Sequence, residues 1–164
     1  MIELEPALKA LTKHNVQFVV VGGVAITAYG SAYITQDLDF CYNRTPTNLK
    51  NLAAALEVFH PWLRDLEEGL PFIWDETTLR NGTNFTLITD IGDIDMLGEV
   101  KGVGTYSNLI ENAVTVSLWD MSIQIISLDE LIISKLAAGR PKDLLVIPEL
   151  ETLREIRDNP DILK

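Results

Sequence analysis

Apolar residues recur along the chain with two different periods, and these periods predict its secondary structure. Leucines at helical spacing predict a helix over residues 3–14, and the β-branched run QFVVV predicts a buried strand over residues 17–21. Further strands are expected over 37–42, 84–90, 93–100, 113–119 and 122–126, the last four as two hairpins. Further helices are expected over 24–30, from Thr45-Pro46 onward, over 128–138 and over 142–157. Ser127 and Glu130 match a capping box at the start of the helix over 128–138, with Ser127 as the N-cap. This order predicts an α/β (α+β) fold in which helices flank a mixed β-sheet.

The length of 164 residues and the hydrophobic share of 47% are typical of one domain with a sizeable core. We expect residues 1–127 to form the core of the fold. Residues 128–164 are expected to form a small C-terminal helical part packed on that core within the same domain. Within the first part, residues 60–82 carry two prolines and several acids, which favours a short helix and an irregular covering loop.

The charge balance narrows the classes of partner. The chain has 13 Lys and Arg against 24 Asp and Glu, a net charge of −11, whereas nucleic-acid binders usually present a basic face. A small nucleotide delivered with a metal ion, or a basic protein partner, fits this balance better than a long duplex does.

Cysteine and histidine are too few for a disulfide framework or for a metal site built from these residues. The single Cys41 excludes an internal disulfide framework, and His14 and His60 lack the spacing of metal ligands. No signal peptide is evident and no apolar run approaches a membrane span, so we expect no membrane association and, by default, a cytoplasmic location.

The segment with the most chemical information is VVVGGVAITAYGSAYITQDLDF, a strand, a Gly22-Gly23 turn, a helix and a strand that begins with Asp37-Leu38-Asp39. Because residues two apart in a strand share a face, Asp37 and Asp39 are expected to project together. Two adjacent carboxylates repel each other unless a cation lies between them, and oxygen ligands suit Mg²⁺. At Gly22 and Gly23 the backbone can approach a phosphate closely. An isolated Asp-x-Asp is often only a solvated pair, and an isolated Gly-Gly is often only a turn. The interpretation as a metal and phosphate site therefore rests on their order along a strand, turn, helix and strand.

This arrangement resembles the signature of the DNA polymerase β-like nucleotidyltransferase superfamily. Three further stretches, TQDLDF, LRNGTNFTLITDIGDIDMLGEV and LDELIISKLAAGRPKDL, resemble a small bacterial branch near the minimal and abortive-infection-type nucleotidyltransferases. The resemblance spans residues 17–144. It implies a nucleotidyltransferase-like fold and in-line transfer of a nucleoside monophosphate from a nucleoside triphosphate such as ATP to an acceptor hydroxyl. Two Mg²⁺ ions are implied, held by Asp37 and Asp39, with Gly22, Gly23 and Thr35 contacting the nucleotide.

The resemblance also implies a third carboxylate on a later strand. Asp93 falls in the expected turn beside Gly92, where an aspartate usually caps the turn, whereas Asp95 lies between two apolar residues of the strand. We therefore choose Asp95 as the third metal ligand and as the residue that helps to deprotonate the acceptor. One departure is Tyr33, which stands where related sequences often carry a basic residue, so a phosphate or base contact is either missing here or supplied by another residue.

Lys135 lies in the apolar stripe of its predicted helix, so its ammonium needs a partner. It either reaches the cleft, to meet an aspartate or the nucleotide phosphates, or extends its head into water. The resemblance favours the first alternative and implies a catalytic Lys135 that neutralises charge or holds the carboxylates in place. Arg140 could hold phosphate or an acid, and Asp143 could be an ordinary residue of a first helical turn.

Two other functions stay open at the level of sequence. One is a weakly active or inactive binding module of toxin–antitoxin type that acts through a protein partner, and the other is a structural domain whose aspartates serve turns and ion pairs. The acceptor is not specified, although the acidic charge favours a small molecule or a protein over RNA. The base preference and the oligomeric state are also open.

Overall fold

A mixed sheet of seven strands forms the centre of the molecule. The computed structural model describes residues 1–164. The strand order is β3-β4-β5-β2-β1-β9-β8, in which β2 pairs with β5 and β1 pairs with β9 in parallel, and the other pairs are antiparallel. The strands are β1 (Phe18–Val21), β2 (Asp37–Tyr42), β3 (Trp62–Leu63), β4 (Phe85–Thr89), β5 (Gly92–Leu97), β8 (Val114–Leu118) and β9 (Met121–Ile125), and a separate ribbon pairs β6 (Glu99–Val100) with β7 (Gly104–Thr105).

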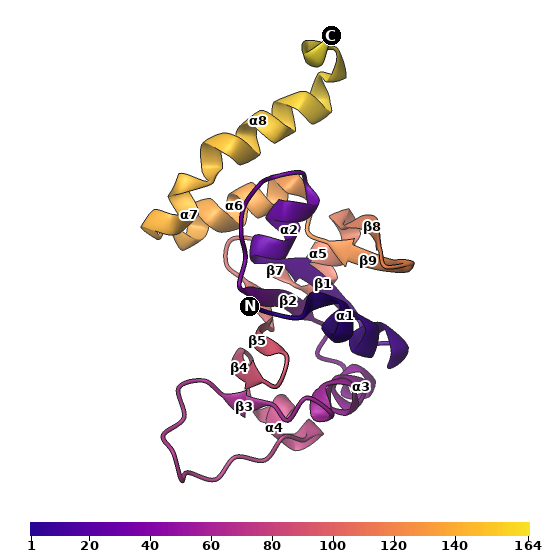
Figure 1. The fold of residues 1–164 in the computed structure, drawn as a ribbon, viewed down its shortest axis with the longest axis vertical. Helices are drawn as coiled ribbons and strands as arrows, with labels where there is room; N and C mark the ends of the chain where they lie inside the picture. Colours follow the sequence, from indigo (N-terminus) through magenta and orange to yellow (C-terminus); the bar gives the residue numbers. More distant parts are fainter.

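Helices gather at both ends of this sheet. Figure 1 shows the C-terminal helices α6, α7 and α8 at the top, and α3 and α4 at the bottom beside the β3 edge. The helices are α1 (Leu4–Lys13), α2 (Gly22–Ala28), α3 (Pro46–Glu57), α4 (Glu76–Asn81), α5 (Tyr106–Asn112), α6 (Leu128–Ala138), α7 (Pro141–Leu145) and α8 (Ile147–Asp158), followed by a 3-10 turn, Pro160–Leu163. The predicted mixed sheet with flanking helices is confirmed.

Strand β2, which lies beside the fully buried β1, has an apolar face and a polar face at its start. All four residues of β1 are buried, and along β2 the residues Leu38 and Phe40 are fully buried. Asp37 and Asp39 alternate with them and are only partly covered. Burial of Leu38 and Phe40 against the helices therefore fixes which face of β2 presents the two acids.

Helix α6 begins as the sequence predicts, with one difference. The Ser127 hydroxyl accepts a hydrogen bond from the backbone N–H of Glu130 at 3.2 Å, so the N-cap is confirmed. The Glu130 side chain, however, accepts a hydrogen bond from Asn112 at 3.0 Å, and the reciprocal half of the expected capping box is not formed.

Other predicted boundaries were wrong in ways that have local causes. The expected single helix over 142–157 is two helices, because a continuous helix would set the ring of Pro148 against the carbonyl four residues earlier. Helix α2 already begins at Gly22, so the glycines form its first turn and do not precede it. Helix α5 and the short strand β3 were not predicted, because each is too short to show a period.

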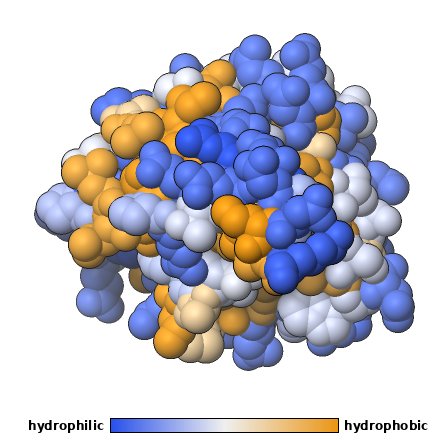
Figure 2. Space-filling view, turned by 90° about the horizontal axis from the view of Figure 1, so that it is seen from above, coloured by the Kyte–Doolittle hydropathy of each residue, from blue (hydrophilic) through white to orange (hydrophobic).

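Apolar side chains also remain on the surface of the C-terminal helices. Ile133, Leu136, Leu144 and Leu145 are all exposed on α6 and α7. Figure 2 looks down on this end of the molecule and shows apolar residues interspersed with polar ones. No helix of the chain has both the length and the apolar composition required to cross a membrane.

Candidate active site

Four aspartates lie on one face of the neighbouring strands β2 and β5. The parallel register sets Asp37 beside Asp93 and Asp39 beside Asp95. Carboxylate oxygens of Asp37, Asp39 and Asp95 lie within 4.8 Å of one another. Asp93 is not in a turn, as the sequence had suggested, but inside β5, because the turn closes one residue earlier than predicted. The structure therefore brings the three predicted acids together, and we call Asp37, Asp39 and Asp95 the carboxylate trio.

The electrostatics of the trio show that negative charge is in excess. Burial, together with the charges of Asp37 and Asp95, raises the pKa of Asp39 to about 7 against the opposing effect of Lys135. Burial also raises the pKa of Asp95, although its hydrogen bond with Arg64 acts in the opposite direction. A site made of carboxylate oxygens alone fits a hard divalent cation such as Mg²⁺, which would relieve this repulsion.

Gly22 permits the backbone to pass directly beside the trio. Its φ is +64°, a conformation that residues with a side chain rarely adopt, and a Cβ atom there would overlap the Asp39 carboxylate. A Cβ on Gly23 would lie 2.5 Å from the Thr35 hydroxyl oxygen. Both glycines are therefore required by close packing, whatever their part in nucleotide binding.

Thr35 fixes the start of strand β2. Its hydroxyl lies 3.0 Å from the backbone oxygen of Asp37 and 3.4 Å from the Asp37 carboxylate, so it donates to the same residue by either route. Together with Tyr33, Thr35 lines the pocket in front of the trio. The structure thus places Thr35 against a predicted metal ligand.

Cationic side chains form the opposite wall of the pocket. Lys135 meets an aspartate, as one interpretation of the sequence expected, but its partner at 3.0 Å is Asp143 and not a member of the trio. Arg140 donates to the same carboxylate at 2.6 and 3.2 Å. Burial alone would raise the pKa of Asp143, but the hydrogen bonds from Arg140 and Lys135 hold it below its ordinary value.

Asp143 is more than a residue of a first helical turn. It is only 1% exposed. Gly139, at φ +65°, ends α6, and Pro141 begins α7, so the chain turns back and sets Asp143 against Lys135. A lysine in an apolar stripe followed eight residues later by an aspartate across a Gly-x-Pro break is the signal that could have predicted this pair.

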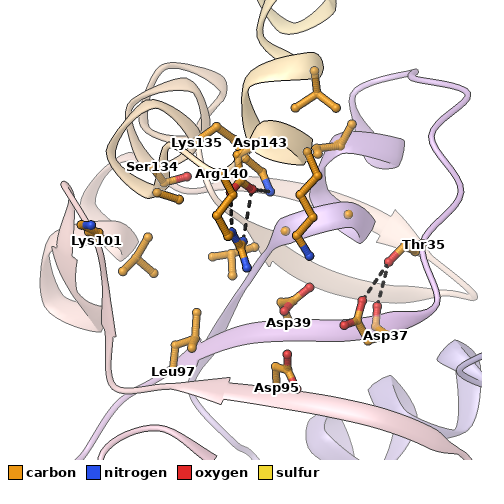
Figure 3. Close-up of a pocket in the computed structure, with 18 of the residues that line it drawn as sticks. Thr35, Asp37, Asp39, Asp95, Leu97, Lys101, Ser134, Lys135, Arg140 and Asp143 are labelled. Carbon is orange, nitrogen blue, oxygen red and sulfur yellow. Dashed lines mark hydrogen bonds and ion pairs between the residues drawn. The ribbon is translucent and has the colours of Figure 1, made fainter. Parts of the chain in front are cut away.

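The two walls enclose a pocket of about 230 Å³. Figure 3 shows the trio on the strands below and, above them, Lys135 and Asp143 on α6 and α7 with Arg140 in the turn between these helices. Besides these groups, the pocket is lined by Gly22, Gly23, Lys101 and Lys142. An anion held by the cationic wall would also meet a cation held by the trio, which is the charge pattern of a site for a metal-bound phosphate.

We expect Asp143→Asn to destabilise the protein by about 2 kcal/mol, because it leaves Lys135 charged, only 16% exposed and without its carboxylate partner. Urea unfolding measures the effect. The matched control is Asp161→Asn, which removes an ion pair with Lys164 whose two side chains are about four-fifths exposed. The control should change stability little, and an equal loss in both variants would contradict the assigned role of Asp143.

Sequence reasoning missed Arg64, which donates a hydrogen bond to Asp95 Oδ1 at 2.7 Å. Arg64 follows β3 and belongs to the segment that was expected to be an irregular loop. It is the single Lys or Arg between residues 51 and 79, within an acidic stretch. That isolation is the one sequence signal that could have drawn attention to it.

Solved structures with the same fold exist at low sequence identity. Neither a protein-family profile nor a curated protein matches the sequence. A provisionally assigned nucleotidyltransferase from Thermotoga maritima is 18% identical, with 96% of each chain covered and a TM-score of 0.59. The lincomycin-bound lincosamide antibiotic adenylyltransferase LnuA is 12% identical, with 93% of this chain and 99% of that chain covered and a TM-score of 0.59. The antibiotic-resistance factor ANT(2'')-Ia is 13% identical, with 98% and 92% covered and a TM-score of 0.55. The chain therefore has the fold of the nucleotidyltransferase superfamily.

Proposed function

We propose that this chain, with its nucleotidyltransferase fold, transfers a nucleoside monophosphate from a nucleoside triphosphate to an acceptor hydroxyl and releases pyrophosphate. The observation that carries the proposal is the convergence of Asp37, Asp39 and Asp95 within 4.8 Å at one side of a pocket whose other side is cationic. A purely structural domain has no use for three carboxylates that repel one another.

Each residue of the site has a part in this reaction. Asp37 and Asp39 would hold two divalent ions, with Asp95 as a ligand on the acceptor side, and bound Mg²⁺ supplies Lewis-acid charge at the phosphate oxygens. Asp95 accepts the proton of the acceptor hydroxyl as the new bond to phosphorus forms. Gly22 and Gly23 let the triphosphate lie close to the backbone, with Thr35 holding Asp37 in place.

The cationic wall contributes charge at the other end of the substrate. Arg140 keeps 60% of its side chain exposed while it pairs with Asp143, so its guanidinium is available to a phosphate. The Lys135 side chain, which also pairs with Asp143, is more buried than that of Arg140 and would act by neutralising charge. With Lys135 from α6 and Arg140 from the turn before α7, the segment 128–164 would complete a site whose acids come from residues 1–127.

The acceptor is proposed to be a small molecule or a protein hydroxyl. The net charge of −11 opposes binding of a long polyanion. Two of the proteins with a similar fold are described as an antibiotic adenylyltransferase and an antibiotic-resistance factor, which supports a small-molecule acceptor.

The test is to incubate the protein with labelled nucleoside triphosphates, Mg²⁺ and a cell lysate, and then to identify what becomes labelled. We expect labelling that is lost with a chelator and in Asp39→Asn. Labelling that survives in Asp39→Asn would contradict the proposal. If calorimetry shows no Mg²⁺-dependent binding of nucleotide, a binding module that acts through a protein partner becomes the better explanation.

A further inference from the structure

Arg64 reaches Asp95 from two strands away. Its backbone N–H donates to the carbonyl of Thr86 at 2.9 Å, so Arg64 extends the pairing of β3 with β4 by one residue. On the next strand Asp95 lies directly opposite Thr86, and on the strand after that Asp39 lies directly opposite Asp95. Residues that face each other across a sheet point to the same side. Arg64, Thr86, Asp95 and Asp39 therefore form one row across the sheet.

The row explains how the contact forms. Two strand spacings separate Arg64 from Asp95, which is about 10 Å, a distance that a guanidinium at the end of a long side chain can cover. Thr86 between them is small and exposed, so it leaves the path open. The guanidinium ends 2.7 Å from Asp95 Oδ1, with its Nε 3.4 Å from Asp93 Oδ2.

The contact lies outside the pocket. Asp95 lines the pocket, whereas Arg64 and Asp93 do not. The Arg64 side chain is 30% exposed and the Asp95 side chain 19%. A bound substrate in the pocket would therefore meet Asp95 but not Arg64, so Arg64 can act on the reaction only through the carboxylate that it holds.

We propose that Arg64 is a positioning residue for Asp95. The Arg64 guanidinium holds one oxygen of the Asp95 carboxylate outside the pocket and leaves the other oxygen for the reaction. This inference rests on the proposed function. It assigns unequal parts to the trio, since Asp37 and Asp39 have no such cationic partner and both remain free for metal. It also means that a positive charge stands beside the site and opposes binding of a divalent cation.

The test compares Mn²⁺ affinity, measured by calorimetry on the full chain with the metal alone, with the rate of labelling from ATP. Arg64→Gln is expected to bind Mn²⁺ about tenfold more tightly, because the opposing charge is gone and both oxygens of Asp95 become available. The same variant is expected to label more slowly, because Asp95 is no longer held in place. A folding defect would weaken both properties, so changes in opposite directions separate positioning from a structural role.

Three further variants make the result decisive. Arg64→Lys keeps the charge and should retain the wild-type Mn²⁺ affinity. Thr86→Leu blocks the path of the guanidinium and should show the same two changes as those expected for Arg64→Gln. It serves as the test variant if Arg64→Gln does not fold. The matched control is Arg44→Gln, since Arg44 donates only to the carbonyls of Arg80 and Gly82 and should leave Mn²⁺ affinity unchanged.

The outcomes distinguish the inference from the function on which it rests. Mn²⁺ binding that is unchanged or weaker in Arg64→Gln overturns the positioning role, as does labelling at the wild-type rate. If Mn²⁺ affinity is instead the same in the wild type and in Asp39→Asn, the trio is not a metal site and the proposed function itself fails.

Discussion

Asp39→Asn should abolish labelling, with a loss of about 1000-fold or more, while making the metal-free protein more stable. Asp39 is the member of the trio that lies directly beside Asp95 and contacts the Gly22 turn. An amide in its place contributes no negative charge, so two carboxylates remain where three had held the cations. Calorimetry with Mn²⁺ measures the loss of metal affinity, and the labelling assay measures the loss of activity.

The gain in stability follows from the sign of the pKa shift. The folded state raises the pKa of Asp39 from 3.8 to about 7, so between these values the unfolded chain releases a proton that the native protein retains. The wild type therefore loses stability as pH rises from about 4 to 7, by at most about 1.4 kcal/mol per pH unit. Because local rearrangement relieves part of this cost, we expect Asp39→Asn to be about 2 kcal/mol more stable at pH 8 and little changed at pH 4.

Two controls complete this prediction. Asp65→Asn removes one charge from an exposed position of the same acidic chain and should change neither property. Saturating Mg²⁺ should stabilise the wild type but not Asp39→Asn, because only the wild type binds the ion. A variant that is less stable than the wild type at pH 8 without metal would show that Asp39 does not suffer the repulsion described above.

Gly22→Ala is expected to cost about 3 kcal/mol of stability and about 100-fold in labelling. The φ of +64° strains any residue with a Cβ atom, by about 1 kcal/mol. The added methyl group would also overlap the Asp39 carboxylate and push it out of the trio. Small displacements of this kind lower catalytic rates by about this factor.

The control for backbone strain is Gly139→Ala. Gly139 has φ +65°, nearly the same as Gly22, and a Cβ there would meet nothing closer than the Leu136 carbonyl at 3.6 Å. This variant should lose about 1 kcal/mol in thermal or urea unfolding and retain Mn²⁺ affinity. Equal effects on metal binding in the two alanine variants would contradict the contact between Gly22 and Asp39.

Local patterns predicted the parts of the site that depend on one element. Asp37 and Asp39 share a face because of the period of a strand, and that period could be observed in the sequence as alternation with Leu38 and Phe40. The mixed sheet and the helix capped by Ser127 follow from signals of the same short range.

Local sequence patterns could not predict the contacts of the site that depend on pairing between distant strands and helices. Asp95 joins the trio only because β2 and β5 pair in a particular parallel register, and the resemblance to a known family, not a local pattern, selected it. Arg64 reaches Asp95 across two strands, so nothing in its own neighbourhood predicted its partner. Asp143 meets Lys135 across a helix break, and the spacing around Gly139 and Pro141 is the one local signal of that pair. The catalytic roles of all these residues stay predictions until the variants are measured.

The register of β2 against β5 has a consequence for folding as well. A slip by one residue would turn Asp37 and Asp39 toward the interior, where Leu38 and Phe40 now pack, and would leave charged groups without water or partners. Misaligned pairings are thereby heavily penalised while the chain searches for its native form. The same acids that make the finished protein less stable help to ensure that it arrives at a unique alignment.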